Sequence, residues 1–235
     1  MKIEIWSDVI CPWCGLGQHR LEAAIARFAQ REHVEVVHRS FQLDPSFPMG
    51  KTLTSRELLT QKYRMSQAQL QRTTAHIEGL AAEDGLTPYH VGDNVVGNTR
   101  LAHELLALAR DRGLEEVAWK RLYHAYFGET RSLFDLDTLI ALGVELGLPA
   151  DDVREALTDG RYAQQVTEEG ELARELGADG VPFVVIDRAL ALSGAQPVAT
   201  FLAAMEQAWR AAPTPIEQVE GVGCGADGCV VPVGE

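Results

Sequence analysis

The spacing of hydrophobic positions changes twice along the chain, and the first stretch predicts a β-α-β unit. Residues 2–7 show the alternation of a short strand. From residue 11 to about residue 31 the apolar positions recur at helical spacing, with Leu21 and Phe28 on one face. Residues 34–43 are rich in β-branched side chains and predict a second strand.

The pattern is helical from residue 46 to residue 179. Ser66 and Gln69 match the capping box at the start of one helix. Asn98 is the candidate N-cap of another, which is expected to stop at Gly113. Further helices are predicted over residues 115–127, 137–147, 151–158 and 162–176.

Strand patterns return after this helical block. Residues 183–186 and 189–192 predict a hairpin, and residues 197–211 predict a closing helix. Neither terminal half could bury its own sheet face alone, so the two halves are expected to share one mixed sheet.

This organisation predicts an α/β fold with a mixed β-sheet flanked by helices and a large all-helical insertion. The sheet domain is discontinuous and takes residues 1–45 and 180–211, with the insertion at 46–179. Residues 212–235 are rich in glycine and predict an irregular, flexible tail.

Composition narrows the classes of function. The net charge of −13 over 235 residues argues against nucleic acid as a partner, because phosphate binding needs clustered cations. No run of eighteen apolar residues occurs, so no membrane span is expected. The N-terminus lacks the features of a signal peptide, and we expect a cytoplasmic protein. The four cysteines fall as two close pairs, which indicates redox or metal chemistry.

The segment Cys11-Pro12-Trp13-Cys14 lies between the first strand and the first helix. A helix N-terminus favours a thiolate, so Cys11 is the candidate nucleophile and Cys14 the candidate resolving thiol. Pro12 suits the first helical turn. Trp13 is expected to form part of an apolar rim for substrate, with ordinary packing as the alternative. Half of a zinc site is the competing interpretation of the two cysteines, and redox chemistry is favoured over it.

A second motif, Gly180-Val181-Pro182-Phe183, places a proline at the start of a strand. An edge-strand proline is one interpretation. The other is a cis peptide opposite the dithiol, which would let the Val181 backbone pair with an extended substrate. Because about 5–6 % of X–Pro bonds are cis, the residues alone favour the trans form.

Together with Ser7-Asp8-Val9-Ile10 and Asn98-Thr99-Arg100-Leu101-Ala102-His103, these motifs resemble the DsbA-like thioredoxin-fold family, and within it the cytoplasmic FrnE-type oxidoreductases. The resemblance implies a redox centre at Cys11 and Cys14, a cis Pro182 and a part in oxidative stress. It also implies that Asn98 lines the cleft, beside its simpler role as a helix cap. We expect His103 to be a structural histidine.

The kappa-class glutathione transferases and 2-hydroxychromene-2-carboxylate isomerases form a contrasting branch. In that branch a serine typically stands at the position of Cys11, and the cleft binds glutathione. Since this chain keeps both cysteines, exchange with protein thiols and disulfides is the favoured function. A glutathione-dependent transferase or isomerase using the same cleft is the alternative, and a zinc-binding or chaperone-like module is a third. We expect no metal and no resident cofactor; glutathione stays open as a co-substrate, and thioredoxin or glutathione systems as redox partners.

Cys224 and Cys229 form the second pair, with four residues between them. Three interpretations compete: a structural pair, a zinc site completed by Cys11 and Cys14, and a second redox pair that exchanges with them. The glycines between and around these cysteines favour the redox pair, because exchange requires a sulfur to reach a disulfide in line.

Overall fold

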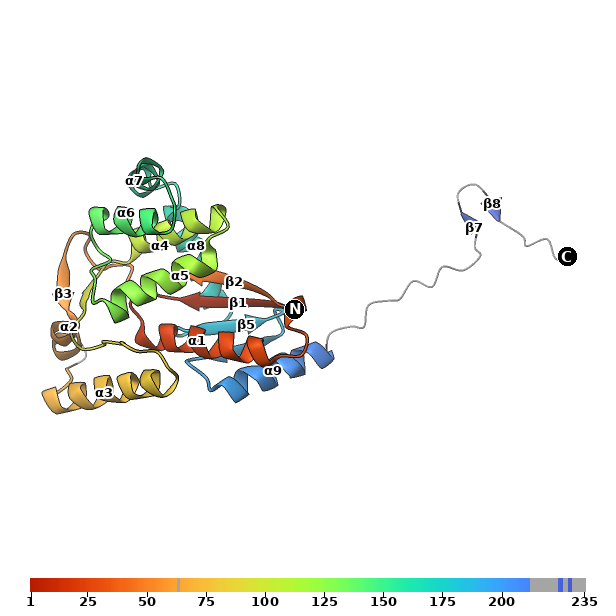
Figure 1. Ribbon diagram of the computed structural model, residues 1–235, viewed down its shortest axis with the longest axis horizontal. Helices are drawn as coiled ribbons and strands as arrows, with labels where there is room; N and C mark the ends of the chain where they lie inside the picture. The colour runs from red at the N-terminus through yellow and green to blue at the C-terminus, as the bar shows by residue number, and fades with distance from the viewer. Residues whose placement is uncertain (63, 212–223, 226–227, 230–235) are drawn as a thin grey trace.

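The computed structural model describes residues 1–62 and 64–211, and the backbone alone at residues 224–225 and 228–229. A small mixed sheet carries helices on both faces, and a larger group of helices lies beside it (Figure 1). The predicted fold class is confirmed. In this part of the chain, no helix is long and apolar enough to cross a bilayer.

The main sheet has four strands in the order β2-β1-β5-β6. β1 (Lys2–Ser7) is parallel to β2 (Glu35–Ser40) and antiparallel to β5 (Phe183–Ile186), which pairs with β6 (Leu190–Ser193). The two ends of the chain therefore build one sheet, as the burial argument predicted.

In the β-α-β unit, two predicted elements end several residues earlier in the structure. The second strand was predicted to reach residue 43 but ends at Ser40, because Leu43 turns to donate its N–H to the carboxylate of Asp8 at 2.8 Å. The first helix was expected to reach residue 31 and ends at Arg27, after which Phe28 is extended.

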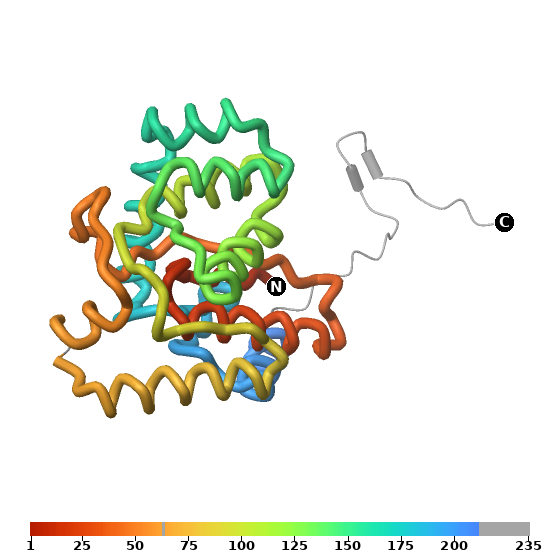
Figure 2. The backbone as a smooth tube through the Cα atoms, turned by 60° about the vertical axis from the view of Figure 1, so that its left-hand side comes forward, coloured from red at the N-terminus to blue at the C-terminus, as the bar shows by residue number. Residues whose placement is uncertain are grey.

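Helices cover the sheet on both faces. α1 (Pro12–Arg27) and α9 (Val198–Ala211) lie together on one face, although they come from opposite ends of the chain (Figure 2). α8 (Ala163–Glu175) packs against β2 on the other face, in a cluster that includes Trp6. Thus one helix of the predicted insertion belongs to the layers of the sheet.

The rest of the insertion is helical apart from one short strand pair. Its helices are α2 (Ser55–Gln61), α3 (Gln67–Glu83), α4 (Arg100–Asp111), α5 (Glu115–Tyr123), α6 (Leu136–Glu145) and α7 (Ala150–Asp159). The strand pair, β3 (Thr52–Thr54) and β4 (Val95–Gly97), was not predicted. The capping box at Ser66 is confirmed. The helix predicted to reach residue 127 is an α-helix to Tyr123 and a π-helical turn over His124–Gly128.

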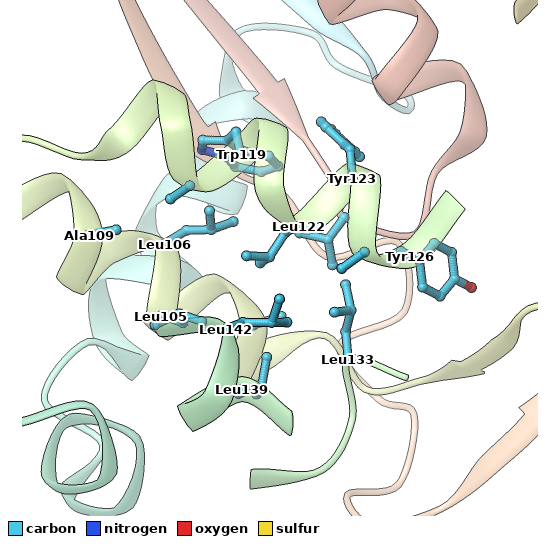
Figure 3. Close-up of a cluster of buried hydrophobic side chains, with 14 of the residues drawn as sticks. Leu105, Leu106, Ala109, Trp119, Leu122, Tyr123, Tyr126, Leu133, Leu139 and Leu142 are labelled. Carbon is cyan, nitrogen blue, oxygen red and sulfur yellow. The ribbon is translucent and has the colours of Figure 1, made fainter. Parts of the chain in front are cut away.

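The insertion has its own hydrophobic core. Side chains of α4, α5 and α6 face one another, among them Leu105, Leu122 and Leu142 (Figure 3). The same cluster continues to Cys11 and Cys14, while the sheet has separate clusters on its two faces. The dithiol therefore lies where the core of the insertion meets the sheet domain.

Candidate active site

The two cysteines of the motif lie in the turn between β1 and α1. The N–H of Cys11 donates to Asp8 O at 3.1 Å, and the N–H of Cys14 donates to Cys11 O at 2.9 Å. Cys11 is the N-cap residue, and Pro12 takes the first helical turn, where its missing N–H costs nothing. Both cysteines are free, so the structure contains a reduced dithiol.

The two thiols differ in burial. Cys11 is 5 % exposed, whereas Cys14 is fully buried. Burial raises the pKa of the Cys14 thiol well above its ordinary value, and a hydrogen bond from the protonated Cys14 to Cys11 and the charge of Cys11 raise it further. Cys14 is therefore protonated at neutral pH, and only Cys11 is reachable from solvent.

The structure places the second motif against the first. The peptide bond between Val181 and Pro182 is cis, as the resemblance implied. The Sγ of Cys11 donates to Val181 O at 3.5 Å. Residues 170 positions apart in the sequence are thus brought together at the nucleophilic sulfur.

Apolar side chains surround Cys11. Pro12, Trp13 and Val181 are half-buried. The Trp13 ring meets His76 edge-on, with their centroids 6.4 Å apart. Trp13 thus packs partly against α3 and leaves part of its surface open.

The side chain of Asn98 forms hydrogen bonds to the loop that follows β2. Its side-chain amide donates to Phe47 O at 2.7 Å and to Pro45 O at 3.2 Å. Its Oδ1 accepts from Gln42 Nε2 at 3.1 Å and from the N–H of Arg100 at 2.9 Å. Asn98 was predicted to be the N-cap of this helix, but α4 begins at Arg100 with Thr99 as its N-cap, and Asn98 instead holds the loop at residues 45–47. Its role as a substrate-binding residue stays a prediction.

Sequence reasoning missed Asp8, a fully buried carboxylate three residues before Cys11. Its carboxylate accepts from the N–H of Leu43 at 2.8 Å and the hydroxyl of Thr99 at 3.4 Å, and lies 3.3 Å from Nε2 of His103. The available signal was an acidic residue between the first strand and the dithiol motif, because such a group must be paired when buried.

His103 is fully buried at the start of α4. Besides Asp8, it meets the ring of Trp119 edge-on, with 5.8 Å between centroids. This environment agrees with the structural role expected for this histidine.

Tyr89 was also missed. It comes from the loop after α3, and its hydroxyl donates to Pro12 O, inside the motif, at 2.6 Å. Nothing in the sequence links these residues, which are 77 positions apart. A cavity of about 330 Å³ adjoins Tyr89, lined by residues of α1 that include Gln18, by the loop 85–89 and by α5 residues that include Lys120.

The second cysteine pair is described only in its backbone. β7 (Cys224–Gly225) and β8 (Gly228–Cys229) pair antiparallel, with Cys224 opposite Cys229. Opposed residues in such a pair have Cα atoms about 4.5–5.5 Å apart, which is within the reach of a disulfide. The side chains of this pair, and the rest of the tail predicted at 212–235, lie outside the described residues.

The described side chains hold no group of three or more histidine, cysteine or acidic residues placed to bind a metal ion. A zinc site that joins Cys11 and Cys14 to the tail would involve side chains beyond this part of the chain.

Comparison with known proteins connects this geometry to a family. The family model of the DSBA-like thioredoxin domain matches residues 2–206, which include the sheet, the insertion and both active-site motifs. The crystal structure of a probable DsbA oxidoreductase from Streptomyces coelicolor is 44 % identical, with 99 % of this chain and 100 % of that chain covered and a TM-score of 0.88.

Two other solved structures are more distant. A 2-hydroxychromene-2-carboxylate isomerase is 18 % identical, with 90 % of this chain and 97 % of that chain covered and a TM-score of 0.67. The cytosolic disulfide reductase DsbM from Pseudomonas aeruginosa is 20 % identical, with 90 % of this chain and 100 % of that chain covered and a TM-score of 0.59. These two likenesses show the fold alone.

The packing of the Pro182 ring on α1 generates a first prediction. A Cβ at Gly17 would lie 2.9 Å from Cγ of Pro182 and 3.4 Å from Cα of Ala195. Gly17→Ala should therefore push Val181 away from Cys11, lowering stability by about 1–3 kcal/mol and the rate of disulfide exchange about ten- to a hundredfold. Urea unfolding and insulin reduction measure the two effects.

Gly79→Ala is the matched control, because a Cβ at Gly79 in α3 meets nothing within 4 Å. This substitution should leave exchange unchanged and raise stability by up to about 1 kcal/mol. Equal behaviour of the two variants would contradict the role assigned to Gly17.

The burial of Cys14 generates a second prediction. In a Cys11→Ser variant, iodoacetamide should alkylate Cys14 at pH 7 at least about tenfold more slowly than in the same protein unfolded in urea. Because the pKa of Cys14 is raised, its thiolate forms only at higher pH. The folded-state rate should therefore keep rising above pH 9. Equal rates in the folded and unfolded protein at pH 7 would contradict the burial effect.

Proposed function

Since the chain belongs to the DSBA-like thioredoxin family of thiol–disulfide oxidoreductases, we propose that it exchanges disulfides with protein thiols through Cys11 and Cys14. The observation that carries the proposal is a free dithiol at a helix N-terminus in which Cys11 keeps 5 % of its surface exposed and Cys14 is fully buried. This arrangement separates an attacking thiol from a resolving one.

The reaction proceeds in two exchanges. The thiolate of Cys11 attacks one sulfur of a substrate disulfide, forming a mixed disulfide and releasing one substrate thiolate. Cys14 then loses its proton and attacks Sγ of Cys11, which closes the Cys11–Cys14 disulfide and releases the second substrate thiolate. The substrate gains two electrons and the dithiol loses them; the reverse sequence oxidises a substrate dithiol.

Val181 supplies the substrate-binding backbone in this proposal. In the reduced protein its carbonyl accepts from the Cys11 thiol. Once Cys11 loses its proton or joins a mixed disulfide, that donor is gone, and the carbonyl can accept from the backbone of an extended substrate. Pro12 and Trp13 supply apolar contact on the other side, and Asn98 holds the neighbouring loop.

We place this exchange in the cytoplasm, with protein thiols and disulfides as substrates and the thioredoxin or glutathione systems as redox partners. The FrnE-like motifs support this placement and a part in oxidative stress. One fold relative, DsbM, has been solved with GSH. No metal or resident cofactor is required by the mechanism.

A glutathione-dependent transferase or isomerase is the second candidate. The observation in its favour is the cavity of about 330 Å³ beside α1, where Gln18, Lys120 and Tyr89 offer polar groups to a small ligand. In that case glutathione would enter as a substrate and not as a redox partner.

Serine substitutions separate the two candidates. Cys11→Ser should abolish insulin reduction and the refolding of scrambled protein, because the nucleophile is lost. In the Cys14→Ser protein, Cys11 should still attack the substrate disulfide. Mixed disulfides with substrate should then accumulate, as seen by mass spectrometry, because no resolving thiol remains. A Cys11→Ser protein that retains glutathione-dependent turnover would support the transferase or isomerase instead.

The tail cysteines have their own test. If Cys224 and Cys229 pass electrons to or from Cys11 and Cys14, replacing both by serine should slow reoxidation of the dithiol in stopped-flow measurements. The matched comparison is the same protein with Ser40→Ala, which leaves all four cysteines in place. Unchanged reoxidation with every oxidant would leave the tail pair structural, and stoichiometric zinc in the reduced protein would support the metal site.

A further inference from the structure

Tyr89 joins the insertion to the first turn of the active-site helix. Its hydroxyl donates to Pro12 O at 2.6 Å. Pro12 is the first residue of α1, so this hydroxyl contacts the backbone of the helix at its N-terminal end. The cysteines stand on either side of Pro12 within this turn.

The insertion fixes the position of the Tyr89 ring. The ring stacks on Phe127 with 4.5 Å between centroids and 20° between planes. The next residue, His90, donates its N–H to Phe127 O at 2.7 Å. Burial, and the charges of the two cysteines, raise the pKa of Tyr89 well above its ordinary value, so the hydroxyl keeps its proton.

The sequence makes room for this hydroxyl at one position of α1. A Cβ at Gly15 would lie 2.5 Å from the Tyr89 oxygen, closer than real Cβ contacts come. A helical glycine costs about 1 kcal/mol relative to alanine. The ring carbons of Tyr89 would lie 3.4 Å from the same Cβ, an ordinary contact. Only the hydroxyl excludes a side chain at Gly15.

We propose that Tyr89 is a positioning residue that holds the first turn of α1 in the geometry from which the Cys11–Cys14 disulfide closes. Closure requires Cys14 to approach Cys11 Sγ in line, and a disulfide tolerates a narrow range of Cα separations. Tyr89 exchanges no proton and forms no bond in this step. It restrains Pro12, the residue directly after Cys11, whose sulfur is attacked.

Loss of the hydroxyl loosens the turn, so ring closure becomes less favourable relative to the open dithiol and to the mixed disulfide. The inference rests on the proposed exchange at Cys11 and Cys14. The experiment therefore first establishes, in the wild-type protein, that this pair equilibrates with reduced and oxidised glutathione as a redox probe.

The test is the equilibrium constant for disulfide closure against the glutathione couple, with the open and closed forms quantified by mass spectrometry after acid quenching. Tyr89→Phe should lower this constant about two- to tenfold, the effect of one hydrogen bond. It should also raise the fraction of protein trapped as a mixed disulfide with glutathione.

Tyr126→Phe is the matched control. Tyr126 is buried, packs against the same Phe127 and donates to Val95 O at 2.8 Å, away from the dithiol. The Tyr126→Phe protein should lose about as much stability as the Tyr89→Phe protein and keep the wild-type equilibrium constant for disulfide closure. If Tyr89→Phe loses stability but keeps that constant as well, Tyr89 is only structural and the inference is overturned.

Gly15→Ala provides an independent route to the same loss, because its methyl displaces the hydroxyl while Tyr89 is still present. Gly15→Ala alone should lower the closure constant as Tyr89→Phe does. The double variant should match Tyr89→Phe and be no worse, since the methyl then meets only ring carbons. Additive losses in the double variant would contradict the shared contact. A wild-type dithiol that never equilibrates with glutathione would defeat the proposed function itself.

Discussion

The active site depends on one buried carboxylate, that of Asp8. Removing a charge from water is costly unless it is paired and hydrogen-bonded, so the fold must bring donors to it. Leu43 comes from the loop after β2, and Thr99 and His103 come from the start of α4. The backbone carbonyl of Asp8 meanwhile accepts from the N–H of Cys11. One residue thus ties together the sheet, the insertion and the turn that carries the dithiol.

The unequal burial of the two thiols follows from this anchored turn. Cys11 is the N-cap and opens toward Val181, whereas Cys14 lies three residues further along and points into the core of the insertion. The negative charge of Asp8 adds to the burial that raises the pKa of Cys14, although the backbone of Asp8 partly offsets it with a hydrogen bond. The attacking and resolving roles are therefore set by position in the fold and not by the chemistry of cysteine, which both share.

Local patterns in the sequence predicted much of this molecule, and long-range contacts explain what was missed. The strands at 2–7 and 183–186 and the cap at Ser66 depend on neighbouring residues, and they were found. The cis form of Pro182 came from family resemblance, since the residues alone favoured trans. Tyr89 gave no signal, because a buried tyrosine is typical of any hydrophobic core and its partner at Pro12 is 77 residues away.

Residues of the insertion form part of the active site and hold the turn that carries the dithiol. Thr99 and His103 of the α4 region pair the carboxylate of Asp8, and Tyr123 of α5 donates to its backbone carbonyl at 3.5 Å. Tyr89 reaches the first turn of α1 from a third segment of the insertion, the loop after α3. A packed core transmits displacement, because its side chains have few voids into which they can relax. The spacing of the two sulfurs is therefore determined jointly by the sheet domain and the insertion, and neither half of the structure could define the redox centre without the other.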